Sequence, residues 1–163
     1  MTAEVFTTAT LTRREAGFVN NTDISDALDI EPRVKSANGE ISGCVGSRYV
    51  LPLSDNTNYS GSAAEGFLVD LATQLAASEL FLQQYEGQGG DLVRAADSKI
   101  KLVREKLEKL KKGLITLVDT DGVELALKTA GLSAISGFPK NTDFDYPDEP
   151  TTVNPIVTMG EKF

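Results

Sequence analysis

The sequence predicts a mainly α-helical protein: a small antiparallel helical bundle with a short strand and an extended C-terminal arm. Two observations lead to this fold class. Between about positions 29 and 114, apolar residues recur at steps of three and four, the spacing of one helix face. Beyond position 131 that periodicity is lost, and four of the six prolines lie at positions 139, 147, 150 and 155. We therefore expect a helical bundle domain over 1–118 and an extended acidic arm over 119–163.

The first helical segments are expected to be short. Thr12 and Glu15 have the spacing of a capping box, in which each side chain satisfies a free backbone donor of the other residue. Asp23 or Ser25 is then expected to cap a further short turn that starts at Asp26.

A longer helix is predicted to begin between Asp29 and Pro32, since proline is favourable in a first helical turn. Its apolar positions are Val34, Ala37, Ile41 and Val45. Gly39, Gly43 and Gly46 share another face, although glycine costs about 1 kcal/mol relative to alanine inside a helix. We interpret these glycines as a place where a neighbouring helix backbone approaches closely.

Two more helices follow. Ser62 and Glu65 form a second capping box, and the helix behind them is expected to run to about Gln84. Asp91 is expected to cap the last helix, and Gly113 is the natural residue to end it. The apolar stripe of this last helix is Leu92, Ala96, Ile100, Val103, Leu107, Leu110 and Leu114.

The segment after the last helix has a different character. Residues 114–118 are strand-like, residues 119–122 form a turn, and residues 123–129 are expected to form a helical turn or two. The Asp-Thr-Asp-Gly sequence of the turn is also reminiscent of a calcium loop. However, Glu124 is too close and Ala130 stands where such a loop needs its closing glutamate. We therefore predict a turn and no bound metal.

The composition argues against catalysis. The chain has 163 residues, a net charge of −8 and no histidine, so the commonest general base and metal ligand is missing. No Ser–His or Cys–His nucleophile pair is possible within one chain. Cys44, the single cysteine, is interpreted as a packing residue, with a reactive thiol as the alternative. We expect no enzyme activity and no cofactor.

Charge and hydropathy also limit the classes of molecule that this chain is expected to bind. A net negative chain is a poor general nucleic-acid binder, and no apolar run approaches the roughly 20 residues that cross a bilayer. Positions 91–113 carry 8 basic and 4 acidic residues, whereas positions 114–163 carry 3 and 8. This asymmetry favours self-association or docking between unlike surfaces. With no secretory signal at the N-terminus, we expect synthesis in a cytoplasm without export.

Residues 26–117 resemble the head–tail connector proteins of tailed bacteriophages, also called adaptor or head-completion proteins, in particular the Mu-like neck protein family. The resemblance rests on a helix that ends in Glu-Ile-Ser-Gly at 40–43 and on the run Gly-Ser-Arg-Tyr-Val-Leu-Pro-Leu at 46–53. It continues in a Leu/Ala-rich helix from Leu68, a basic helix ending at Gly113, and the apolar segment 114–118. Such proteins often carry an aromatic residue where this chain has Cys44.

The resemblance implies a structural virion protein of the neck, made in the cytoplasm of a bacterial host. Its subunits would form a homo-oligomeric ring, usually of twelve copies, beneath the portal protein at the capsid vertex. The ring would extend the DNA channel, through which DNA passes without specific binding, and would present a platform to the next neck or tail protein.

The arm is the expected partner-binding element. Large residues spaced along an extended chain suit docking into pockets of a portal or of a neighbouring subunit. The expected anchors are Phe138, Phe144, Tyr146, Ile156 and Phe163. Two other functions remain open at this point. One is a different neck component, such as a stopper or tail terminator, and the other is a non-viral helical adaptor that binds a single protein.

Overall fold

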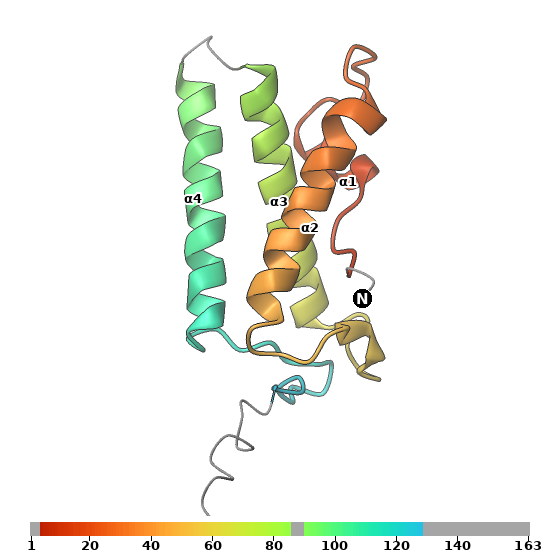
Figure 1. Cartoon of the computed structure of the whole chain (residues 1–163), viewed down its shortest axis with the longest axis vertical. Coiled ribbons are helices and arrows are strands. Elements are labelled where there is room, and N and C mark those ends of the chain that lie inside the picture. The colour runs from red at the N-terminus through yellow and green to blue at the C-terminus, as the bar shows by residue number, and fades with distance from the viewer. Residues whose placement is uncertain (1–3, 86–89, 129–163) are drawn as a thin grey trace, which may run out of the picture. The chain divides into compact units, whose positions relative to one another are not determined.

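The computed structural model describes residues 4–85 and 90–128, and three long helices dominate this part of the chain. They are α2 (Glu31–Val45), α3 (Ala63–Gln84) and α4 (Asp91–Lys111). Figure 1 shows α2 and α4 running in one direction and α3 between them in the other. The protein is therefore a mainly α antiparallel bundle, as predicted. The expected arm from residue 129 onward lies outside the described residues.

The first helix differs from its prediction. α1 (Ala9–Glu15) begins after Thr8, whose hydroxyl accepts a hydrogen bond from the Leu11 N–H. Thr12, the expected cap, instead lies inside the helix and is buried. The capping-box spacing was misleading because Thr8 stands at a second possible start, one helical turn earlier. The next prediction is confirmed: Ser25 caps η1 (Asp26–Ile30), a single turn of π-helix.

α2 begins where proline predicted it, but its glycines have a different environment. Ala37, Ile41 and Val45 are fully buried, which confirms the predicted core face. Gly39 and Gly43 face open space, and a methyl group added at either would meet no atom within 4 Å. The expected close approach of a neighbouring helix therefore does not occur at these two positions within the described chain.

Two polar side chains fix the segment before α1 to the bundle. The buried Asn38 side chain accepts hydrogen bonds from the N–H groups of Phe6 and Thr7, both at 3.0 Å, and donates one to the Thr7 carbonyl. The Glu4 carboxylate accepts from two backbone N–H groups at the start of η2 (Leu53–Asp55). Because its amide is paired in this way, Asn38 can occupy the core without leaving an unsatisfied group.

α3 is the central helix, and its N-terminus is capped as predicted. The Ser62 hydroxyl accepts from the Glu65 N–H, while the Glu65 carboxylate accepts from the N–H of Gly61, one residue before the expected partner. The helix contacts α1, α2 and α4. Its buried residues accordingly cover a wide face and comprise Ala64, Leu68, Leu71, Ala72, Leu75, Ala76, Ala77, Ser78 and Leu80.

The predicted stripe of α4 is confirmed at five positions, from Ala96 to Leu110. The ends differ, since Leu92 and Leu114 are 71% and 74% exposed. Asp91 is the first helical residue rather than the cap, a position that Gly90 takes. The helix ends at a Schellman motif, in which the N–H groups of Gly113 and Leu114 bond back to the carbonyls of Leu110 and Lys109.

The segment after α4 folds back under the bundle without forming a regular strand. Residues 114–118 were predicted as a strand but make only one bridge, between Val118 and Glu124. Residues 123–128 were expected to be helical but are not. Residues 123–125 pair with 117–119, and residues 126–128 pair with 48–50. The compact unit therefore runs to Lys128, ten residues past the predicted boundary at 118.

Candidate partner-binding surfaces

The predicted anchors of the arm lie outside the described residues. Phe138, Phe144, Tyr146, Ile156 and Phe163 all follow Lys128, the last described position. Their role as partner-binding residues therefore stays a prediction. The structure does describe residues 114–128, which precede this part of the chain and lie on the underside of the bundle in Figure 1.

A buried tyrosine holds residues 114–128 to the bundle. Tyr49 follows α2 and is fully buried, and its hydroxyl accepts a hydrogen bond of 2.9 Å from the Leu117 N–H. The same hydroxyl lies 3.3 Å from a carboxylate oxygen of Glu124 and can donate to it. Burial raises the pKa of the Tyr49 phenol, so the group stays protonated and able to donate at neutral pH.

Charged groups surround the contact between Tyr49 and residues 114–128. The Arg48 guanidinium lies 2.7 Å from the Glu124 carboxylate and 5.5 Å from the centre of the Tyr49 ring. Lys128 donates from its ammonium group to the Gly46 carbonyl, and its backbone N–H donates to the Arg48 carbonyl. The Gly-Ser-Arg-Tyr run therefore fixes the path of residues 114–128, a role that the sequence alone did not indicate.

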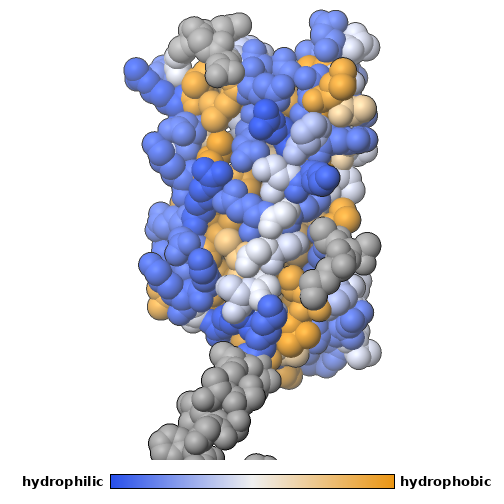
Figure 2. All heavy atoms as spheres, viewed as in Figure 1, coloured by the Kyte–Doolittle hydropathy of each residue, from blue (hydrophilic) through white to orange (hydrophobic). Residues whose placement is uncertain are grey.

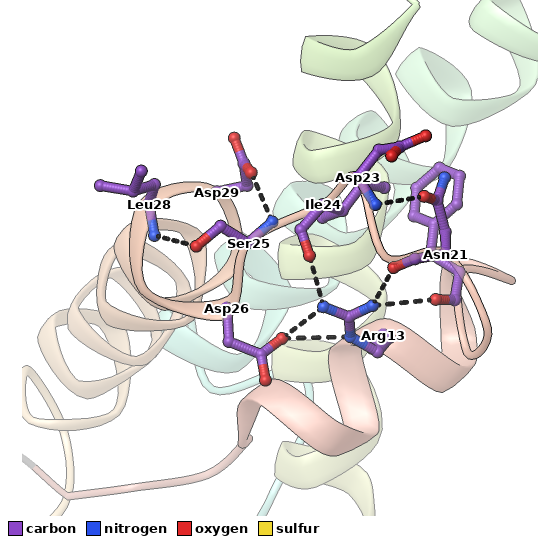
Figure 3. Close-up of polar contacts among 9 residues, drawn as sticks. Arg13, Asn21, Asp23, Ile24, Ser25, Asp26, Leu28 and Asp29 are labelled. Atoms are coloured by element: carbon purple, nitrogen blue, oxygen red, sulfur yellow. Dashed lines mark hydrogen bonds and ion pairs between the residues drawn. The ribbon is translucent and has the colours of Figure 1, made fainter.

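The loop between α1 and η1 is organised by one arginine (Figure 3). Arg13 donates to the backbone carbonyls of Phe18, Asn21 and Ile24, at 3.2, 2.6 and 2.6 Å. It also makes two hydrogen bonds to one carboxylate oxygen of Asp26. These five bonds match the five N–H donors of a guanidinium, so the loop is held as a rigid unit.

We call residues 17–31 the acidic knob. Leu28 is 78% exposed, and Figure 3 shows its side chain directed away from the Arg13 network. Val19, in the loop between α1 and η1, is 59% exposed. Within positions 17–31 the sequence has four acidic residues and no basic one. An exposed leucine in η1, between Asp26 and Asp29, is a candidate docking element, which the sequence analysis missed.

α4 offers a surface of the opposite sign. Between Asp91 and Lys111 the helix carries seven basic and four acidic residues. Its Lys101 and Lys109 pair with acids one turn earlier, and Arg104 pairs with Glu40 of α2. Figure 2 shows this side of the molecule as mainly hydrophilic. Leu102 interrupts the polar surface, with 49% of its area exposed.

A shallow groove of about 200 Å³ lies between the end of α1, α3 and α4. Its floor includes Ala77, Phe81 and Ala96, and an ion pair of 3.6 Å between Lys99 and Glu15 crosses its rim. The two rim charges cancel, so the groove has no charge preference for a particular occupant.

The described residues offer little chemistry beyond binding. No group of three or more Asp, Glu, Cys or His side chains in them is placed to hold a metal ion. The predicted turn at Asp119 is confirmed, since its carboxylate accepts from the N–H groups of Asp121 and Val123. Burial and the nearby Glu40 raise the pKa of the Cys44 thiol, which favours a packing role over a reactive one.

Of the helices that the structure describes, none combines the length and the apolar character needed to cross a lipid bilayer. Comparisons with protein families, with curated proteins and with solved structures find no match to this chain.

Proposed function

We propose that this chain is a structural subunit of a phage head–tail connector, forming a ring below the portal that extends the DNA channel and joins head to tail. The observation that carries the proposal is the run at 46–53, which the resemblance singled out. In the structure its tyrosine and arginine anchor residues 114–128 under the bundle. A fixed point of departure is what a docking arm requires, because it limits where the arm can reach.

The arm then supplies the contact with the portal. Phe138, Phe144, Tyr146, Ile156 and Phe163 are its anchors, set among acidic residues such as Asp143 and Asp145. Buried aromatic anchors commonly carry most of the binding energy at protein interfaces. A second copy of the chain, the portal protein and a downstream neck or tail protein are the partners, and the DNA in the channel is not bound specifically.

Two other functions are weighed against this one. Stoppers and tail terminators tend to be rich in strands, whereas the described residues contain only two isolated β-bridges. A non-viral helical adaptor would use the same bundle to bind one protein and would not form rings. Stoichiometry with the partner separates that function from the connector.

Truncation after Gly137 tests the arm. The shortened chain keeps the whole described unit and loses all five anchors. We expect it to fold but not to be incorporated into heads, measured by blotting purified particles and by counting infectious units. The control is the triple substitution Thr151→Ala, Thr152→Ala and Thr158→Ala, which keeps the anchors and should be incorporated normally. A normal yield of infectious particles from the truncated chain would contradict the proposal.

A further inference from the structure

We infer that the acidic knob of one copy docks on the outer face of α4 of a second copy, so that copies join head to tail. The inference rests on the proposed function, because it names the two surfaces that meet between neighbouring subunits of the ring. It begins from the two oppositely charged surfaces described above.

The knob is preorganised for binding. Arg13 holds three carbonyls and the Asp26 carboxylate of this loop, and Asp29 accepts a 2.8 Å bond from the Ser25 N–H. A loop that is already ordered loses little entropy on association, which lowers the cost of binding. A single exposed leucine is ordinary on a protein surface. Leu28 is different because it lies in η1, between Asp26 and Asp29, directly after the loop that Arg13 holds.

The receiving surface is complementary in charge. α4 has an excess of three basic residues, from seven basic and four acidic side chains. The exposed Leu102 lies near the middle of this helix and offers an apolar contact for Leu28. Lys101, beside Leu102, is 77% exposed although it pairs with Asp97, so a carboxylate of the knob can compete for it. Such pairing steers the approach and selects the orientation more than it adds affinity.

The positions of the two surfaces fit a repeating contact. In Figure 1, α4 forms one side of the bundle, and η1 with the start of α2 lies toward the other side. A contact between two different patches of one chain is heterologous, so each copy keeps one free patch for the next copy, until a ring closes. An isologous contact would stop at a dimer.

Two substitutions in the full-length chain test the inference. Leu28→Asp removes the apolar tip of the knob, and Leu102→Asp removes its contact on α4. Both side chains are exposed, so the fold is retained, as circular dichroism verifies. We expect the unaltered chain to self-associate and each variant to be monomeric in sedimentation velocity. The matched control is Val5→Asp, another exposed apolar position, which should assemble like the unaltered chain.

Mixing the two variants gives the sharpest result. The intact knob of the Leu102→Asp chain can dock on the intact α4 of the Leu28→Asp chain, and no further copy can add. A 1:1 heterodimer that weakens as salt rises is therefore expected. Absence of the heterodimer, assembly of either variant alone, or an unaltered chain that stays monomeric overturns the inference.

Failure of the head-to-tail docking can be distinguished from failure of the connector proposal. If a ring forms on the portal with either variant, the inference fails and the connector remains. If the heterodimer forms but the unaltered chain does not bind the portal, head-to-tail docking stands and the connector proposal fails.

Discussion

Arg13 uses all five N–H donors of its guanidinium to hold one loop and the helical turn that follows it. Replacement by alanine leaves three carbonyls and the Asp26 carboxylate without their donor. We expect a loss of about 1–3 kcal/mol in the free energy of unfolding, measured by urea denaturation. Arg14→Ala, on the same helix but exposed, is the matched control and should change stability by less than about 0.5 kcal/mol. Equal losses in the two variants would contradict the assigned role.

Tyr49 allows a similar test with the loss of a single oxygen. Tyr49→Phe keeps the buried ring but removes the acceptor for the Leu117 N–H. We expect a destabilisation of about 1–2 kcal/mol, with faster amide exchange concentrated in residues 114–128. Tyr85→Phe, at a half-buried tyrosine, is the control. Unchanged exchange in 114–128 would show that the hydroxyl does not hold this segment.

Glu79 makes the stability depend on pH. Burial raises the pKa of this carboxyl above 4.5, and Arg104 and Arg33 only partly oppose that shift. Just above the ordinary carboxyl pKa, the folded state therefore holds a proton that the unfolded state has lost. The free energy of unfolding accordingly falls as pH rises through this interval. Glu79→Gln should flatten the pH profile obtained from urea denaturation, and an unchanged slope would rule out Glu79 as its source.

At the scale of elements, alanine substitutions at two glycines, one inside a helix and one just after a helix, should have opposite effects on stability. Gly113 has a φ of 77°, and a methyl group there would overlap the Arg48 guanidinium. Gly39 lies inside α2 and faces open space. We expect Gly113→Ala to lower the melting temperature, since an alanine with positive φ costs about 1–2 kcal/mol. Gly39→Ala should raise it through a gain of about 1 kcal/mol. A loss at Gly39 would mean that this face is already covered.

The elements also show what sequence can predict and what it cannot. α2, α3 and α4 were predictable because apolar periodicity and end signals such as Pro32, Ser62 and Gly113 agree with each other. α1 was misplaced because Thr8 and Thr12 both suit a helix start, and only tertiary burial of Thr12 decides between them. Residues 114–128 have no periodicity, and their path depends on the distant side chains of Arg48 and Tyr49.

The candidate surfaces likewise have some features that the sequence predicts and others that it does not. The basic character of α4 is visible in the sequence, and so is the acidic run from 15 to 32. The exposure of Leu28 is not visible in the sequence. Leu28 and the buried Ile30 are apolar residues two positions apart, and nothing in the sequence indicates which of them faces outward. The Arg13 network also escapes prediction, since three of its partners are backbone carbonyls, whose directions depend on the folded loop.

At the scale of the whole molecule, the described unit is a bundle with different chemistry on different sides. In Figure 1 its basic α4 forms one side and η1 lies toward the other, and Tyr49 sets the point on the underside where residues 114–128 are held. Together these features fit a subunit that contacts like neighbours laterally and a different protein through its C-terminal segment. The connector proposal brings both kinds of contact into one ring.

The most direct measurement is to mix the purified full-length chain with the portal protein encoded in the same genome, then image the complex and determine its mass. The connector account predicts a closed ring of this chain at one end of the portal, and the mass gives its copy number. A chain that remains monomeric and never binds the portal would contradict the account. The bundle would then belong to an adaptor for a single protein partner.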